Sequence, residues 1–142
     1  GLGDVYKRQQ YASLFPFPIY PMNYVSNEKE LVDIYNAVDL YVTPSLQDNL
    51  PNTIVEAMAC GIPCVGFNVG GIPQMIDHLH NGYVAEYQSA KDLANGIRWT
   101  LTEGEYDNLS EEACRKALSS YSESIISMRY IDIYNKITGS HA

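Results

Sequence analysis

Two acids, Asp48 and Glu56, are the residues whose type and spacing could do chemistry, with seven residues between them. Pro51 is typical of a first helical turn and Gly61 of a helix end, so a helix is expected over residues 51–60. Asp48 then lies in the loop ahead of this helix, and Glu56 lies one to two turns inside it at about 1.5 Å per residue. Glu56 stands in the apolar run TIVEAMAC, where a charge needs a partner or a ligand. The alternative is a solvated helix face, since two acids at this spacing are common.

The segment between the two acids would supply backbone N–H donors. The amides of Leu50, Asn52 and Thr53 fall where the helix begins, and a helix N-terminus offers unpaired donors and a partial positive charge. Such an end suits a diphosphate. A carboxylate accepts hydrogen bonds from vicinal hydroxyls, which ribose and hexose edges present. The segment therefore predicts a site for an extended ligand with a diphosphate at its middle.

Short apolar runs alternate with helical patterns along the rest of the chain. Strands are expected at 19–22, 40–43, 63–67 and 83–86. Helices are expected at 27–38, 51–60, 89–101, 110–120 and 122–137, with a glycine turn and a short helix within 68–77. Strands separated by helices indicate parallel crossover units, so the fold class is α/β: a Rossmann-like, doubly wound parallel sheet with C-terminal helices. Ligands of such sheets bind beyond the carboxyl ends of the strands, where the two acids follow residues 40–43.

Two local expectations accompany this arrangement. Leu93, Ile97 and Leu101 recur at helical spacing and are expected on one packed face. Asn81 and Gly82 form a dipeptide typical of a tight turn before the last strand.

The composition excludes several classes of protein. The chain has 142 residues, enough for one domain with a core, and its apolar fraction of 46% is typical of a globular protein. A formal net charge of −8 argues against DNA or RNA as a partner. No run of about eighteen apolar residues is present, so no membrane-spanning helix is expected. Cys60, Cys64 and Cys114 lack the pattern of a disulfide framework or a zinc site, so reduced, buried thiols in a cytosolic setting are expected.

Other polar residues have simpler explanations than a ligand. His78 and His80 lie without an acid-and-histidine constellation, so they are interpreted as loop histidines and no metal site is expected. Gly70 and Gly71 could touch a ligand, but a turn that needs positive φ explains them equally well. Trp99 and the tyrosines of the C-terminal helices fit helix packing better than a sugar platform.

A resemblance to a known family covers residues 19–137. The stretch SLQDNLPNTIVEAMACGIPCVGFNVGGIPQMI resembles the signature of glycosyltransferase family 4. NYVSNEKELVDIYNAVDLYVTPS is similar to the preceding helix and strand of that family, and YSESIISMRYIDIYNKI to its C-terminal helix. These enzymes have the GT-B fold, in which two Rossmann-like domains face each other across a cleft. The resemblance implies that residues 10–142 are part of a C-terminal, nucleotide-sugar-binding domain, while residues 1–9 are interpreted as a foreign leader.

The resemblance also implies a role for each matching residue. Glu56 matches the acid that binds the ribose hydroxyls, and Asp48 matches the catalytic acid that contacts the transferred sugar. Asn49, Leu50, Asn52 and Thr53 match the turn whose backbone holds the diphosphate. Asn23 and Tyr24 fall where a loop lines the base pocket. The members that this chain resembles are metal-independent and need no cofactor; the nucleotide-diphosphate sugar is the donor substrate.

The chain departs from the family pattern at three positions. Asp48 stands where Glu is commoner, so its carboxylate reaches about one methylene less far. Pro51 replaces a residue that often contributes an amide, and Gln74 replaces an acid. The family's phosphate-binding Arg and Lys lie upstream, and residues 10–28 contain neither residue type. The fragment alone is therefore expected to be inactive, with the acceptor bound by an N-terminal domain.

The function implied is transfer of a glycosyl group from a nucleotide-diphosphate sugar to an acceptor hydroxyl with retention. Two alternatives stay open: a nucleotide-sugar epimerase of GT-B architecture, and a non-catalytic nucleotide-binding module. An epimerase would need ionisable groups near the sugar beyond Asp48, and a module would bind its ligand with no partner domain. The implied setting is assembly of polysaccharide or lipid-linked glycan in the cytoplasm, with or without peripheral association of the full-length enzyme with the inner face of the membrane.

Overall fold

The computed structural model describes residues 10–22, 24–49, 51–121 and 139. The expected leader at 1–9 and the expected helix at 122–137 lie outside these ranges, as do Asn23 and Leu50 of the predicted site.

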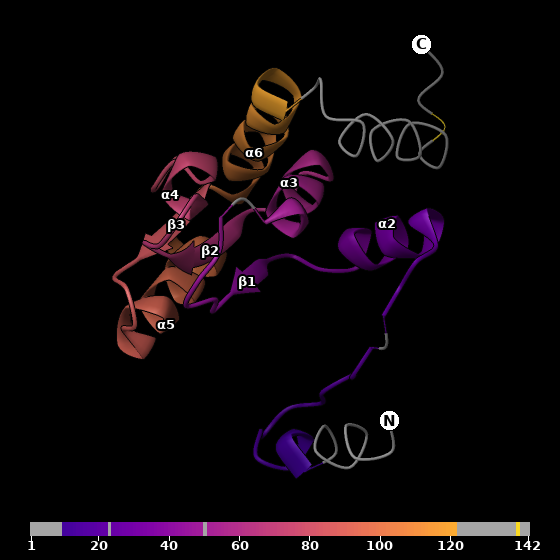
Figure 1. Cartoon of the computed structure of the whole chain (residues 1–142), viewed down its shortest axis with the longest axis vertical. Helices are drawn as coiled ribbons and strands as arrows, with labels where there is room; N and C mark the ends of the chain where they lie inside the picture. The colour runs from indigo at the N-terminus through magenta and orange to yellow at the C-terminus, as the bar shows by residue number, and fades with distance from the viewer. Residues whose placement is uncertain (1–9, 23, 50, 122–138, 140–142) are drawn as a thin grey trace.

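The described residues contain a three-stranded parallel sheet (Figure 1). Its strands, in spatial order, are β1 (Tyr41–Thr43), β2 (Cys64–Phe67) and β3 (Gly82–Ala85). Val42 pairs with Val65, and Val65 pairs in turn with Tyr83. Each strand follows the previous one only after a helix, which is the connection that parallel neighbours require. The predicted parallel crossover units are confirmed.

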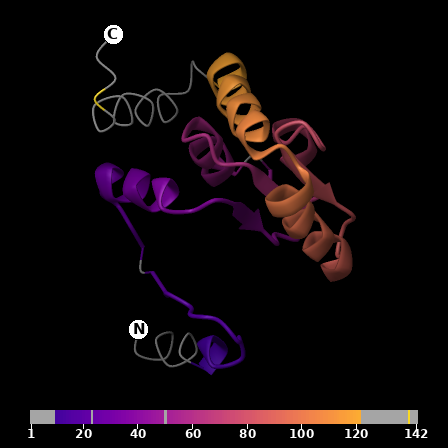
Figure 2. The ribbon, with the colours of Figure 1, turned by 180° about the vertical axis from the view of Figure 1, so that it is seen from behind.

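Helices cover both faces of this sheet. They are α2 (Glu28–Asn36), α3 (Asn52–Ala59), α4 (Ile72–Met75), α5 (Ala90–Arg98) and α6 (Tyr106–Tyr121). Both views of the ribbon show α3 and α6 side by side on one face and α5 on the other (Figures 1 and 2). Successive strand residues alternate between these faces: Cys64 lies against Ile54 of α3, whereas Val65 lies against Gly96 of α5. This is the doubly wound arrangement that the sequence predicts.

Close packing of α3 holds the first face together. Ile54, Ala57 and Met58 are fully buried, and α6 places its small residues Ala113 and Ala117 in the same core. Small side chains on α6 let the two helices approach closely. The site that begins α3 is therefore carried by a rigidly packed helix.

The cap predicted for α2 is confirmed. The Asn27 side chain accepts a hydrogen bond from the Glu30 amide at 3.2 Å, which satisfies one of the unpaired donors of the first turn. The buried side of α2 contains Val32 and Tyr35. This cap fixes where α2 begins and hence which residues it presents to α3.

The three cysteines are unpaired thiols, as expected. Cys64 is fully buried, Cys60 is nearly so, and Cys114 is half-buried. Burial raises the pKa of the Cys60 thiol to about 12, with smaller contributions from the nearby Cys114 and Glu56. Cys60 and Cys64 therefore behave as small apolar core residues.

The strand expected at 19–22 is wrong. Ile19, Tyr20 and Met22 are exposed, and this stretch lies apart from the sheet in both ribbon views (Figures 1 and 2). Pro18 and Pro21 have no N–H to give to a sheet, so the apolar side chains alone did not make this segment a strand.

The face expected for Leu93, Ile97 and Leu101 is interrupted. The α-helical pattern ends at Arg98, and a π-helical turn follows over Trp99–Glu103. This wider turn shifts the register, so Leu101 is 49% exposed while Leu93 and Ile97 are half-buried. The next helix also begins earlier than expected, at Tyr106, whose hydroxyl donates to the Asp39 carbonyl at 2.7 Å.

The turn expected before the last strand is confirmed in part: it covers residues 79–81, so it includes Asn81 but ends before Gly82. Gly82 is the first residue of β3, and a Cβ there would lie 2.1 Å from the Cys64 carbonyl oxygen. Asn81 is buried, and its side chain accepts from the Asp77 amide at 2.9 Å. Asn81 therefore closes the turn, whereas Gly82 allows the close approach of β3 to β2.

The packing of α3 gives the first prediction. Ile54→Ala should lower the free energy of unfolding by about 2–5 kcal/mol, because it leaves a cavity at a fully buried position between α3 and the sheet. Urea denaturation measures the change. Lys29→Ala, which removes only an exposed ion pair with Asp33, is the control and should change stability little. Equal losses for both variants would contradict the core described here.

Candidate functional site

The loop that joins β1 to α3 carries the first predicted acid. Residues 44–49 form no regular secondary structure, and the loop follows the carboxyl end of β1. Asp48 is half-buried within it, and α3 begins at Asn52. The expected placement of Asp48 ahead of a helix N-terminus, beyond the carboxyl end of a parallel strand, is confirmed.

The start of α3 has no side-chain cap. Pro51 is the N-cap residue, one position before the first turn in which the sequence places it, and it makes no side-chain hydrogen bond. Among the described residues, none accepts a hydrogen bond from the amides of Asn52 and Thr53. These two donors are at the positive end of the helix, where an anion is favoured.

The glycine turn before α4 supports the backbone of Asp48. Gly70 has a φ of +54°, and a Cβ at this position would lie 1.6 Å from the Asp48 carbonyl oxygen. The Gly71 amide donates to that same oxygen at 3.2 Å. Position 70 therefore requires glycine for two reasons: its backbone is left-handed, and the Asp48 backbone leaves no room for a Cβ. The turn positions the loop that carries the acid.

A tyrosine fixes the other side of this loop. The Tyr87 hydroxyl donates to the Leu46 carbonyl at 3.2 Å, and the Tyr87 ring meets Phe67 edge-on with ring centres 6.5 Å apart. Phe67 is the last residue of β2. The loop is therefore held by backbone and side-chain contacts from two neighbouring strand ends.

Glu56 is the buried member of the acid pair. Only 9% of its surface is exposed, and its Oε2 accepts a hydrogen bond from the Tyr35 hydroxyl at 2.9 Å. Its neighbours Ile54, Val55 and Met58 are buried in the core, as predicted. The expectation that this charge needs a partner is confirmed, and α2 supplies one.

Glu56 lies at the wall of a groove of about 810 Å³ between α2, β1 and the start of α3. The groove is lined by Met22, Tyr24, Val25, Ser26, Glu28, Leu31, Ile34, Tyr35, Val38, Leu40, Tyr41, Thr53 and Glu56. Most of these side chains are apolar; Thr53 and Glu56 supply polar groups from α3, and Ser26 and Glu28 supply others from the start of α2. Largely apolar walls with a few placed polar groups are typical of small-molecule sites.

The predicted site residues divide between this groove and the loop. Tyr24, Thr53 and Glu56 share the groove, with the Tyr24 side chain 93% exposed at its edge. Asp48 does not line the groove, and its backbone lies against the glycine turn. Asn49 is exposed on the same loop.

Tyr41 is a site residue that the sequence did not reveal. Its hydroxyl donates to Thr53 Oγ1 at 2.9 Å. Burial raises its pKa, the hydrogen bond to Thr53 lowers it, and the nearby Cys64, Glu56 and Asp48 raise it further. The phenol is therefore protonated at neutral pH and able to donate. A tyrosine in a short buried strand was the available signal, because such a hydroxyl needs a partner.

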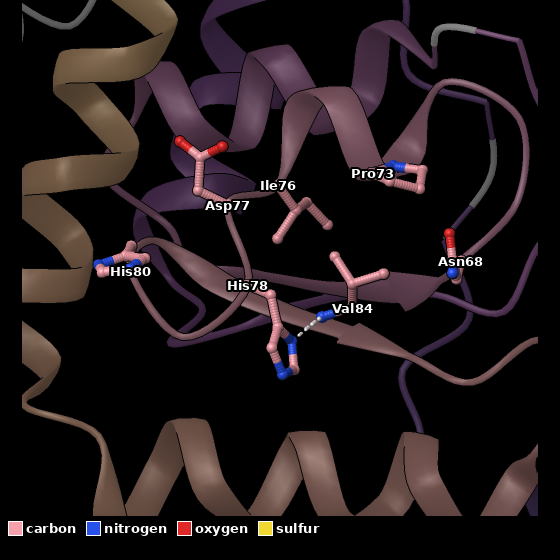
Figure 3. Close-up of a pocket in the computed structure, with 7 residues that line it drawn as sticks. All are labelled: Asn68, Pro73, Ile76, Asp77, His78, His80 and Val84. Carbon is pink, nitrogen blue, oxygen red and sulfur yellow. Dashed lines mark hydrogen bonds between the residues drawn. The ribbon is translucent and has the colours of Figure 1, made fainter.

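A second hollow, of about 550 Å³, lies beside β3 and α4 (Figure 3). Its polar residues do not converge: in Figure 3 the side chains of Asp77, His78 and His80 point away from one another. His78 Nδ1 accepts from the Val84 amide at 3.0 Å, so this ring fastens its own loop to the strand. The interpretation of His78 as a loop histidine is confirmed.

Solved structures of glycosyltransferases share this arrangement. The Anabaena protein HepE in complex with UDP-glucose matches with a TM-score of 0.67 at 20% identity, over 99% of this chain and 37% of that one. The C-terminal domain of the group 1 glycosyl transferase LpcC from Francisella tularensis matches with a TM-score of 0.67 at 19% identity, over 84% of this chain and 61% of that one. The fold is thus that of the C-terminal domain of a GT-B glycosyltransferase.

The chain belongs to the family described as glycosyl transferases group 1, which it matches over residues 22–117. A curated relative is the N,N'-diacetylbacillosaminyl-diphospho-undecaprenol alpha-1,3-N-acetylgalactosaminyltransferase of Campylobacter jejuni, which is 30% identical over 117 residues. That alignment covers 82% of this chain and 31% of the relative. The chain therefore spans about a third of the length of this relative.

The contact between Gly70 and Asp48 gives the second prediction. Gly70→Ala should destabilise the chain by about 1–3 kcal/mol more than Gly139→Ala, because overpacking against the Asp48 backbone adds to the strain of positive φ. Gly139 is a matched control, since it has a φ of +65° and no atom of the described residues lies within 4 Å of an added Cβ. Thermal unfolding compares the variants, and amide hydrogen exchange should rise within residues 45–49 in Gly70→Ala alone. Equal effects of the two substitutions would show that the loop does not depend on this contact.

Proposed function

We propose that this chain is the donor-binding, C-terminal part of a retaining glycosyltransferase of family 4, and that the full-length enzyme transfers a glycosyl group from a nucleotide-diphosphate sugar to an acceptor hydroxyl. The observation that carries the proposal is the placement of Glu56, a buried carboxylate on the wall of a groove, one turn behind the uncapped start of α3. The family description names glycosyl transfer, which favours this activity over an epimerase or a binding module.

The proposed roles follow the order of groups along α3. Glu56 accepts hydrogen bonds from the ribose hydroxyls, and the base occupies the apolar part of the groove near Tyr24. The amides of Asn52 and Thr53 hold the diphosphate at the positive end of the helix. Asp48, on the loop ahead of the helix, contacts the sugar that is transferred.

This order suits the chemistry of transfer. The bond from the anomeric carbon to the diphosphate oxygen breaks, and a new bond forms from that carbon to the acceptor oxygen. The acceptor loses its proton, and negative charge develops on the leaving diphosphate. Backbone donors already fixed at the helix start stabilise that charge without rearranging, and the Asp48 carboxylate faces the positive charge that develops on the sugar.

The comparisons support the class of donor and leave the acceptor open. HepE was solved with UDP-glucose, and the Campylobacter relative is named for N-acetylgalactosamine transfer to a lipid-linked diphosphate. A nucleoside diphosphate sugar is therefore the donor class that we propose here. The acceptor, whether glycan or lipid-linked, would be bound by an N-terminal domain.

The proposed setting is the cytoplasm, in polysaccharide or lipid-linked glycan assembly. Within the described ranges, no helix is both long and apolar enough to cross a membrane. The contact that we propose between the full-length enzyme and the inner membrane surface is peripheral.

The third prediction separates the two acids by ligand. In the full-length enzyme, Glu56→Gln should weaken binding of the nucleotide sugar and of the free nucleoside diphosphate alike, by about 1.5–3 kcal/mol, because both ligands carry the ribose. Asp48→Asn should lower turnover and alter sugar choice but leave binding of the nucleoside diphosphate nearly unchanged, because that ligand lacks the sugar. Calorimetric titration with both ligands measures the difference.

Glu111→Gln, on an exposed turn of α6, is the control and should change neither titration. Equal losses of nucleoside diphosphate affinity in Asp48→Asn and Glu56→Gln would contradict the two separate roles. Unchanged affinity in a folded Glu56→Gln variant would remove Glu56 from the ribose site.

A further inference from the structure

We propose that Tyr35 is the positioning residue for Glu56: its hydroxyl holds the carboxylate at the groove wall in the orientation that binds the ribose. This inference rests on the proposed function of Glu56. It assigns to α2 a part in donor recognition, although α2 lies upstream of the loop and helix that carry the two acids.

The contact joins two helices at a buried point. Tyr35 is 5% exposed, Glu56 is 9% exposed, and the Tyr35 hydroxyl lies 2.9 Å from Glu56 Oε2. The same hydroxyl lies 3.4 Å from the Thr53 carbonyl oxygen, so its single proton is better placed for the carboxylate. A hydrogen bond to a charged acceptor is stronger than one to a neutral carbonyl.

The tyrosine ring is itself fixed. It meets the ring of Tyr41 edge-on, with centres 6.3 Å apart, and Tyr41 in turn donates to Thr53 Oγ1. Two tyrosines, one from α2 and one from β1, therefore contact the first two turns of α3. With its ring held in this way, Tyr35 keeps its hydroxyl beside Glu56 Oε2 and the Thr53 carbonyl oxygen.

Fixing one carboxylate oxygen is useful for binding a diol. A glutamate side chain has three rotatable bonds, and ordering it costs free energy at the moment of binding unless it is already held. A carboxylate has about four acceptor positions, and the Tyr35 hydroxyl takes one of them, so this bond is compatible with ligand hydroxyls at the same carboxylate. Tyr35 would therefore raise donor affinity by holding Glu56 before the ligand arrives.

The experiment is a double-mutant cycle in the full-length enzyme, with nucleoside diphosphate as the titrated ligand. Tyr35→Phe should weaken binding about three- to tenfold, the range for one lost hydrogen bond. In a Glu56→Gln background the same substitution should weaken binding less than twofold, because the group that Tyr35 positions is already changed. The KM for the nucleotide sugar should rise in Tyr35→Phe while kcat changes little, since ribose contacts are made equally in the ground and transition states.

Tyr83→Phe is the matched control. The Tyr83 hydroxyl donates to Asp92 Oδ1 at 2.9 Å, the same distance as that from Tyr35 to Glu56. Its removal should leave ligand affinity unchanged. Equal losses from Tyr35→Phe in both backgrounds would overturn the proposal and leave Tyr35 a packing residue. Full affinity in Tyr35→Phe, with Glu56→Gln still impaired, would overturn it while keeping the ribose role of Glu56. If Glu56→Gln itself binds nucleoside diphosphate normally, the result contradicts the proposed ribose role of Glu56, and with it the positioning role of Tyr35.

Discussion

A carboxylate buried in a protein interior is destabilising unless donors reach it, and this constraint shapes the groove side of the structure. Glu56 belongs to a helix whose neighbouring residues form the core, so the helix cannot turn to expose it. One donor is the Tyr35 hydroxyl, which requires α2 to lie against the first turns of α3. The cap at Asn27 fixes where α2 begins and so sets the turn on which Tyr35 falls. The groove lies between α2 and the start of α3, the two helices that the Tyr35–Glu56 hydrogen bond joins.

The backbone of Asp48, in the loop ahead of the helix, is supported by a glycine turn. The parallel pairing of β1 with β2 brings the loop after β1 beside the turn after β2. Gly70 and Gly71 then support Asp48 through its carbonyl oxygen, with no room for a Cβ at Gly70. One acid is held by a tyrosine hydroxyl and the other by a glycine turn. Along the chain, the uncapped amides of α3 lie between the two acids, which is the order that the proposed binding of an extended nucleotide-diphosphate sugar requires.

Local signals in the sequence predicted the parts of this arrangement that depend on neighbours along the chain. The cap at Asn27, the apolar runs of β1 and β2, and the helix start near Pro51 are such features. Contacts between distant segments were missed for a physical reason: neither the Gly70 contact with Asp48 nor the tyrosine contacts with Thr53 and Glu56 follow from periodicity. The same limit explains the errors. Residues 19–22 have side chains typical of a strand but do not join the sheet. Gly82 begins β3 rather than completing a turn, because its backbone lies against the Cys64 carbonyl oxygen of β2.

The central claim is that Glu56 and the start of α3 together bind the ribose and diphosphate of the donor. A crystal structure of the full-length enzyme with a bound nucleoside diphosphate tests it most directly. The account predicts ribose hydroxyls within hydrogen-bond distance of the Glu56 carboxylate, with phosphate oxygens at the amides of Asn52 and Thr53. A ligand bound elsewhere, for example in the hollow beside His78, with no ligand hydroxyl at Glu56, would contradict it.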